Sequence, residues 1–309
     1  MQPNTYFCYS HTMLSVLIPT YNTLVAPLVE NIHAQCQKVC YPFEIIVLDD
    51  ASDNPAFLDQ YEMMEQLPNC RVIKNQLNLG RTKSRGLLAD MAVYPWLLFL
   101  DADVMPKYPD FIQRFALDGV QEAPILFGGV TYHSEKPVIE EVLRWKYGMS
   151  REAKNVRERY KRPYFIVSGN LMIQKATFST INLVSENVYG LDNIVSYFIY
   201  QNGIKVIHID NPVFHLGLEN SETFIRKSIE SLETSIRFES KLDLPDDFRP
   251  IQKLYKRLKN FRLLGIFMIC MKWFMKSIEK NLYSNNPNLK VFDLYRLYHF
   301  SLLKEKNDA

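Results

Sequence analysis

Two groups of aspartates follow apolar, β-rich runs in the first hundred residues. Asp49-Asp50 comes directly after Glu44–Leu48, and Asp101-Ala102-Asp103 comes directly after Trp96–Leu100. Concentrated negative charge is unfavourable unless a cation or another positive group offsets it. When two carboxylates flank a small residue, one can bind a hard cation while the other accepts a hydrogen bond from a neighbouring hydroxyl. Magnesium or manganese held by one or two carboxylates and by substrate phosphates is a common arrangement of this kind.

The elements that must position these carboxylates alternate between strand and helix. The expected strands are 14–18, 44–48, 71–74 and 96–100, and the expected helices are 24–37, 55–66 and 81–91. This alternation predicts an α/β fold with a mostly parallel sheet covered by helices on both faces. Because ligands bind outside the carboxyl ends of the strands in such sheets, the aspartates should meet at one edge.

After Pro106 the regular alternation of short strands and helices ends. The expected strands are now 125–131, 164–173 and 204–207, and the expected helices are 138–161, 191–200 and 221–240. Leu242–Pro250, with two prolines and three acidic residues, is typical of a linker. One or two helices should follow, at about 251–281 and 289–303. The sequence therefore predicts an α/β domain over residues 1–240 and a helical C-terminal extension over residues 241–309.

Four segments of the first part resemble the family 2 glycosyltransferases of the GT-A fold. In chain order they are Ser15–Asn22, Ile46–Ser52, Asn78–Gly86 and Phe99–Asp103, the last with the family's DXD motif. Each segment alone is a weak signal, whereas the four together in the family's order and spacing are specific. The resemblance covers about residues 14–220. It implies a GT-A fold, a nucleoside diphosphate sugar as donor (UDP-linked), inversion at the anomeric carbon, and Mn²⁺ or Mg²⁺ as the metal.

The resemblance also assigns roles in the nucleotide pocket. Thr20 and Tyr21 would line this pocket, Asp50 would contact the uracil, and Arg85 would lie near the base or the diphosphate. Simpler interpretations remain for two of them. Asp50 could be part of a solvated strand-end turn or helix cap, and Arg85 could form a structural ion pair.

At the sugar end of the donor, the resemblance implies that Asp101 contacts the ribose or sugar and that Asp103 binds the metal. Gly169, in Ser168-Gly169-Asn170, would let the substrate approach the backbone, unless this segment is a plain turn. His215, in a His-x-Gly setting, would complete metal or diphosphate binding, because imidazole suits manganese. His208, in an apolar strand, is expected to be a hydrogen-bonded structural residue.

The family commonly has Gly-x-Glu-Asp before a helix, with the last Asp as the base that deprotonates the acceptor. This chain has Gly190-Leu191-Asp192-Asn193 there. Because Asn cannot act as a base, we expect Asp192 to take the role. The alternative for Asp192 is an N-cap of the helix that follows.

The C-terminal part is basic. Residues 251–309 contain 12 Lys and Arg against 4 Asp and Glu, although the whole chain carries a net charge of only +2. Apolar residues with Trp273 and flanking lysines suit a helix on the inner leaflet of a membrane; packing on the catalytic domain or on a dimer partner is the alternative. The basic stretch 138–162 could contact an acceptor phosphate or lipid, or be a solvated helix surface. No recognised nucleic-acid motif accompanies either region.

These observations predict a cytoplasmic enzyme, peripheral on the cytoplasmic face of the membrane, with a glycan or lipid-linked oligosaccharide as acceptor. Five scattered cysteines, an odd number, favour free thiols in a reducing compartment. Two other classes of protein share some of these features. A non-catalytic nucleotide-sugar or glycan-binding module would explain Asn193. A nucleotidyltransferase should carry a Gly-rich loop after its first strand, but the turn here is Pro19-Thr20-Tyr21-Asn22, which lacks glycine.

Overall fold

The computed structural model describes residues 13–117, 122–182, 184, 186–242 and 244–308. The chain forms two compact units, each assembled from separate segments. The first unit comprises Met1–Thr131, Lys154–Asn187 and Phe198–Gly217. The second unit comprises Tyr132–Ala153, Val188–Tyr197 and Leu218–Ala309. These units are defined by packing and each combines distant parts of the chain. The predicted boundary at residue 240, between a catalytic domain and a C-terminal extension, stays a prediction.

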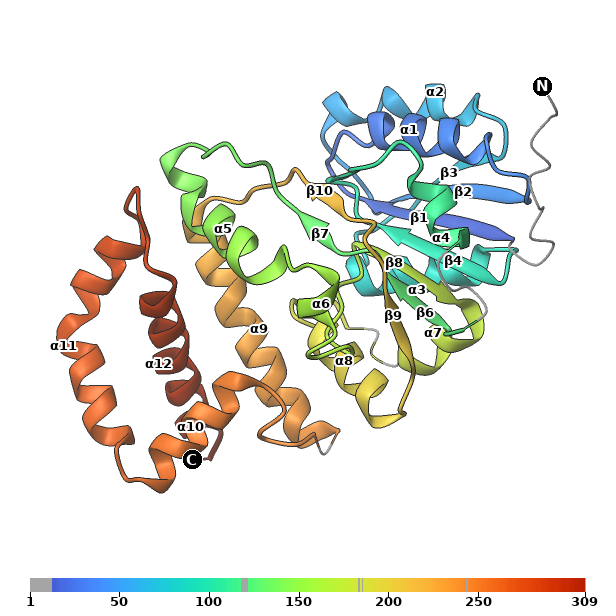
Figure 1. Cartoon of the computed structure of the whole chain (residues 1–309). Coiled ribbons are helices and arrows are strands. Elements are labelled where there is room, and N and C mark those ends of the chain that lie inside the picture. The colour runs from blue at the N-terminus through green and yellow to red at the C-terminus, as the bar shows by residue number, and fades with distance from the viewer. Residues whose placement is uncertain (1–12, 118–121, 183, 185, 243, 309) are drawn as a thin grey trace. The chain divides into compact units, whose positions relative to one another are not determined.

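A seven-stranded sheet in the order β3-β2-β1-β4-β8-β6-β9 is the centre of the first unit (Figure 1). The strands are β1 (Leu14–Thr20), β2 (Phe43–Asp49), β3 (Cys70–Lys74), β4 (Trp96–Leu100), β6 (Ile125–Phe127), β8 (Asn170–Gln174) and β9 (Val206–His208). All neighbouring pairs are parallel except those of β8, which is antiparallel to both β4 and β6. The predicted α/β fold with a mostly parallel sheet is confirmed.

Helices cover both faces of this sheet. They are α1 (Ala26–Cys36), α2 (Gln60–Glu65), α3 (Arg81–Met91), α4 (Phe111–Leu117), α6 (Val156–Arg159) and α7 (Lys175–Ile181), with a 3₁₀ turn at Pro55–Phe57. α1 and α3 lie on opposite faces of β1 (Figure 1). Because both faces are covered, β4 is buried along its whole length, which is why its sequence is a continuous apolar run.

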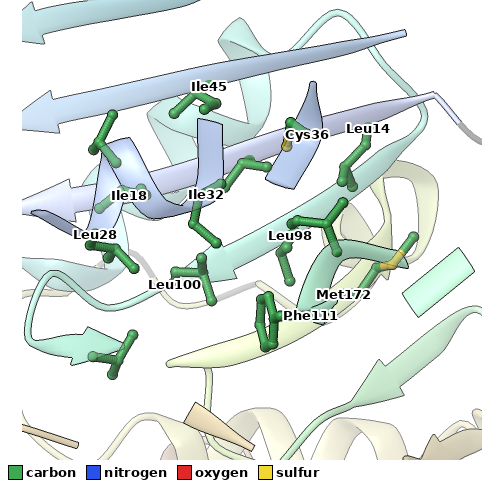
Figure 2. Close-up of a cluster of buried hydrophobic side chains, with 14 of the residues drawn as sticks. Leu14, Ile18, Leu28, Ile32, Cys36, Ile45, Leu98, Leu100, Phe111 and Met172 are labelled. Carbon is green, nitrogen blue, oxygen red and sulfur yellow. The ribbon is translucent and has the colours of Figure 1, made fainter. Parts of the chain in front are cut away.

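The main core lies between α1 and the sheet. Figure 2 shows Leu28, Ile32 and Cys36 of α1 among side chains of β1, β2 and β4. Phe111 of α4 and Met172 of β8 extend the same cluster (Figure 2). All five side chains are at most 2% exposed. This packing fixes the strands whose carboxyl ends carry the aspartates.

Two glycine positions shorten the strands expected from sequence. The expected strand 125–131 is split into β6 and the two-residue β7 (Val130–Thr131), because Gly129 has a φ of +89° and turns the chain. The expected strand 164–173 was too long, since β8 begins only at Asn170, after Gly169. β7, β10 (Val213–His215) and β5 (Val104–Pro106) form a separate three-stranded sheet with β10 in the middle.

The second unit is helical. Its elements are the 3₁₀ turn Ile139–Glu141, α5 (Val142–Tyr147), the single-turn π-helix Gly148–Glu152, α9 (Ser221–Lys241), α10 (Pro250–Asn260), α11 (Leu264–Leu282) and α12 (Leu289–Asp308). α8 (Asp192–Gln201) begins in this unit and ends in the first. The helical stretch expected at 138–161 is present in two pieces, residues 139–152 and α6, with a break between them. α10 and α11 are two helices, separated at Arg262, whose φ is +58°.

Apolar residues of α9 hold the second unit together. Phe224 and Ile225 pack with Leu143 of α5 and Phe292 of α12, while Leu232 and Ile236 pack with residues of α10 and α12. α11 packs on α12, and α12 packs on α9 (Figure 1). Within the described part of the chain, no helix is both long and apolar enough to cross a bilayer.

Candidate donor-binding site

The carboxyl ends of β1 and β2 form one part of the site. Thr20 is the last residue of β1, and its carbonyl accepts a hydrogen bond from the Asp50 amide at 2.9 Å. Thr20 is 3% exposed, and its hydroxyl has no hydrogen-bond partner among the residues that the structure describes. Buried polar groups are normally paired, so this hydroxyl is suited to a ligand at the strand end.

The carboxylate of Asp50 ties β2 to the start of α3. One oxygen accepts hydrogen bonds from the Asn75 side chain at 2.7 Å and from the Leu79 amide at 2.9 Å, and the other accepts one from the Gly80 amide at 2.7 Å. Gly80 has a φ of +82°, which favours glycine. Asp50 is buried, so it is not a solvated turn residue. Its bonds to the Leu79 and Gly80 amides at the start of α3 fit the helix-cap alternative that the sequence also allowed. Its contact with uracil stays a prediction.

The turns after β1 and β2 are tied to each other. Asn22, with a φ of +46°, donates its backbone amide to the Ser52 hydroxyl at 2.8 Å and its side-chain amide to Asp53 at 2.8 Å. Tyr21 lies in the same turn and is 45% exposed. A fixed backbone with an exposed ring is what stacking on a nucleobase would require, and this role of Tyr21 stays a prediction.

Asp101, which follows β4, lies between two arginines of α3. Arg85 donates to one carboxylate oxygen at 2.5 Å and Arg81 to the other at 3.1 Å. Burial raises the pKa of Asp101, but the charges of Arg81 and Arg85 outweigh it and hold the pKa below its ordinary value. Arg85 therefore forms the ion pair that the sequence allowed, and its contact with a nucleotide stays a prediction.

Arg81 is a site residue that the sequence reasoning missed. Its side chain is 52% exposed, whereas that of Arg85 is 8% exposed. The spacing held the signal, because residues four apart lie on one face of a helix. With Arg85 buried on Asp101, the more exposed Arg81 is the cation of the pair that a ligand can reach.

Gly169 lies against Asp101. A Cβ atom on Gly169 would be 2.7 Å from a carboxylate oxygen of Asp101, closer than real Cβ contacts come. The Asp101 amide also donates to the Gly169 carbonyl, at 3.3 Å. The segment is thus more than a plain turn, since the missing side chain makes room for the Asp101 carboxylate.

Asp103 and His215 come together through the small sheet. His215 pairs with Val104 in the antiparallel ladder of β10 and β5, and the Leu216 amide donates to the Asp103 carbonyl at 2.8 Å. His215 Nε2 lies 3.7 Å from Asp103 Oδ2. A Cβ atom on Gly217 would lie 2.2 Å from the same oxygen, so the His-x-Gly segment leaves space for this carboxylate.

The donor set fits a hard cation that takes most of its ligands from elsewhere. Asp103 supplies a carboxylate and His215 an imidazole, whereas Asp101 is held by Arg81 and Arg85. In the described residues, no three His, Cys, Asp or Glu side chains converge as a metal cage. Mg²⁺ characteristically uses one or two protein carboxylates together with substrate phosphates and water, and this site offers that number.

Asp192, the expected base, belongs to the second unit. It is half-buried and stands at the start of α8, where its negative charge interacts favourably with the helix dipole. Asn193 donates its side-chain amide to the Gly190 carbonyl at 3.0 Å. The Asn193 side chain thus has a structural role in the turn before α8, and the catalytic role of Asp192 stays a prediction.

His208 is the hydrogen-bonded structural residue that the sequence predicts. Its Nε2 lies 2.9 Å from the Pro163 carbonyl, and the side chain is buried at the end of β9. Burial lowers the pKa of His208 to about 4, so the ring is neutral at pH 7.

The sequence pattern of glycosyl transferase family 2 matches residues 15–180, which is more than half of the chain. The chain belongs to glycosyltransferase family 2. The match runs from β1 through α7 and includes the ends of β1, β2 and β4 where the aspartates lie. The family predicted from the four motifs is therefore confirmed.

Two curated proteins show local similarity to this family 2 chain. An uncharacterized glycosyltransferase of Haemophilus influenzae is 34% identical over 93 residues, which are 29% of this chain and 29% of that protein. A hyaluronan synthase of Pasteurella multocida is 32% identical over 104 residues, which are 32% of this chain and 10% of that protein. The chain thus spans less than a third of each relative that it matches.

Two solved structures share the fold. A mannosyltransferase from Pyrobaculum calidifontis, PcManGT, in complex with GDP-Man and Mn²⁺, aligns with a TM-score of 0.55 at 15% identity, covering 94% of this chain and 86% of that one. Staphylococcus aureus TarS aligns with a TM-score of 0.50 at 18% identity, covering 72% of this chain and 39% of that one. These likenesses, together with the sheet order, identify the fold as GT-A, as predicted.

Proposed function

We propose that this protein transfers a sugar from a nucleoside diphosphate sugar to an acceptor hydroxyl, with inversion at the anomeric carbon. The observation that carries the proposal is the grouping of Asp101, Asp103 and His215 with Arg81 and Arg85 in one unit. Two carboxylates, two guanidinium groups and an imidazole provide balanced charge before any ligand binds. A donor diphosphate and a divalent cation would add opposite charges and preserve that balance.

We propose a UDP-linked donor held at the ends of β1, β2 and β4. Thr20 offers a buried hydroxyl, Tyr21 an exposed ring and Asp50 a fixed carboxylate to the nucleoside. Asp101, held by Arg85, would accept hydrogen bonds from the ribose or the sugar, and Gly169 would leave room for the Asp101 carboxylate beside the donor. PcManGT is described with GDP-Man, so the donor test below includes GDP-sugars.

Asp103 and His215 would hold Mn²⁺ or Mg²⁺ in this proposal. The bound cation would offset charge that develops on the departing diphosphate. Arg81 would orient the same diphosphate with its exposed guanidinium, because such groups bind phosphate oxygens in a fixed fork. Asp192 would accept the proton of the acceptor hydroxyl, which makes a single displacement with inversion possible.

We propose a glycan or a lipid-linked oligosaccharide as the acceptor, and the cytoplasm as the place of action. Cys36, Cys70 and Cys270, among the cysteines within the described residues, are free thiols. Free thiols are typical of a reducing compartment such as the cytoplasm, which supports this location.

The test is a thermal-shift screen of UDP-, GDP- and dTDP-sugars with and without manganese, followed by a transfer assay. A ligand of the folded state raises the apparent melting temperature, and we expect a UDP-sugar to do so in a manganese-dependent way. Asp103→Ala should remove the manganese dependence; a shift that keeps it would refute the metal assignment. Binding of a donor without hydrolysis or transfer would support the non-catalytic module that Asn193 suggests.

A further inference from the structure

α11 in the second unit is packed on one side only. Leu264, Phe267, Met271, Ile278 and Leu282 are buried or half-buried and recur at helical spacing. α11 contacts α12 and α10; Ile278 and Leu282 join one apolar cluster of the unit, and Leu264 and Phe267 join the other. This inward row anchors the helix, whereas the large apolar residues on its other side are exposed in the described part of the chain.

The outward side of α11 and the bend before it expose large apolar side chains. Trp273 is 80% exposed and Phe261 is 74% exposed. The other members of this apolar face are Leu263, Ile266, Ile269 and Phe274. Positions 266, 269 and 273 recur at spacings of three and four, so they form one row along the helix. Large exposed apolar patches on soluble proteins mark surfaces that bind something else.

Lysines border this row. Lys272, Lys276 and Lys280 are four residues apart and exposed, and the last two lie three and seven positions after Trp273, on its side of the helix. From residue 250 to residue 282 the chain contains eight Lys and Arg against one Glu. Long lysine side chains can place their charge beside an apolar surface while their methylene groups cover it.

We propose that this apolar face of α11, with the bend at 261–263, docks on an anionic lipid bilayer, with α11 lying along the membrane surface. The apolar row would enter the boundary between headgroups and acyl chains, Trp273 would lie at headgroup level, and the lysines would contact anionic headgroups. No helix of the described residues could cross a bilayer instead. Docking of this kind does not depend on the proposed transfer activity, although it would suit a lipid-linked acceptor.

Charge favours a bilayer over a second copy of the chain. A symmetric dimer through this face would bring its lysine row against the same row of the partner, and like charges at an interface are costly. Lysine is also depleted at protein interfaces, whereas it is favoured beside anionic lipid.

The experiment is vesicle co-sedimentation of the full chain, without donor or metal. Vesicles contain phosphatidylcholine alone or with phosphatidylglycerol. We expect binding to the anionic vesicles that weakens as salt is raised. The triple variant Lys272→Gln, Lys276→Gln and Lys280→Gln should bind on the order of 100-fold more weakly, at about 1 kcal/mol per cation near the surface. Ile269→Ser with Trp273→Ser should lower binding at least tenfold as well.

Two matched control variants separate this surface from general effects. Lys38→Gln, Lys107→Gln and Lys205→Gln remove the same charge from exposed sites in the first unit, and Val93→Ser with Met63→Ser removes exposed apolar side chains elsewhere. Both should bind vesicles like the unchanged protein. Equal loss in the controls, or equal binding to neutral and anionic vesicles, would refute the proposal. So would a dimer in sedimentation velocity that Trp273→Ser converts to a monomer while vesicle binding is absent.

Discussion

Gly217→Ala should move the carboxylate of Asp103 while leaving the fold intact. The new Cβ would lie 2.2 Å from Oδ2 and 3.0 Å from both Cβ and Cγ of Asp103, whereas ordinary contacts lie at 3.4–4 Å. The oxygen must therefore move by about 1.2 Å, the difference between 3.4 and 2.2 Å. Rotation of the carboxylate alone is insufficient, because Cβ of Asp103 is also too close.

The expected cost falls on function more than on stability. Overpacking of this kind costs about 1 kcal/mol of folding free energy when the neighbour can yield, and the Asp103 side chain is 32% exposed. A displacement of about 1 Å at a reacting centre can cost about 100-fold in rate. We therefore expect a 10- to 100-fold loss of kcat/KM for donor turnover, with a melting temperature only a few degrees lower.

The assay compares the manganese-dependent thermal shift and donor turnover of Gly217→Ala with those of Gly265→Ala. An added Cβ on Gly265 would have no atom within 4 Å, so Gly265→Ala is a control for replacing glycine by alanine without creating a close contact. If Gly217→Ala keeps the full manganese-dependent shift and full turnover, then Asp103 is not held in a functional position by this contact and the metal assignment fails.

Three further predictions concern other parts of the chain. Asp192→Asn should leave the donor-induced thermal shift unchanged and abolish transfer; retained transfer would remove Asp192 as the base. Arg85→Ala should cost about 3 kcal/mol of stability in urea unfolding because it removes a buried partner of Asp101, whereas Arg81→Ala, at an exposed position, should cost at most about 1 kcal/mol but weaken donor binding. Since the folded pKa of His208 is about 4 and its ordinary value is 6.5, the unfolded state binds more protons between these values. Stability should therefore fall by up to about 3 kcal/mol from pH 7 to pH 4, and His208→Gln should flatten that slope in pH-dependent urea unfolding.

The central strands and α3 could be predicted closely. A strand that is buried on both faces of a sheet has a continuous apolar sequence, which is easy to recognise. β4 is a continuous apolar run that covers the predicted 96–100, and α3 covers the predicted 81–91. β8 was predicted too long because Tyr164–Val167 is β-prone in composition, while Gly169 must instead fit against Asp101. Strand propensity depends on the local sequence, so it cannot predict a close contact between residues 68 positions apart.

The site was predictable where a motif names a residue and unpredictable where packing decides. Asp101, Asp103 and His215 follow from type and position, and the structure brings them into one unit. The pairing of Asp101 with both Arg81 and Arg85 depends on the orientation of α3, which a single sequence does not encode locally. Similarly, Leu143 of α5 packs with residues of α9 and α12 in the second unit. The composition of the linker 242–250, from which the boundary was predicted, gives no sign of this contact.

The ladder between β5 and β10 has a consequence for how the protein matures. Val104 and His215 are 111 positions apart in the chain, yet their pairing sets Asp103 beside His215. Contacts between such distant residues close late in folding because the entropy of a long loop must be lost first. A nascent chain that ends before Val213 contains β1, β2 and β4 but lacks half of the Asp103–His215 pair. Manganese-dependent donor binding would therefore report that synthesis has passed this point and that the small sheet has closed, which makes it a measure of completed folding as well as of activity.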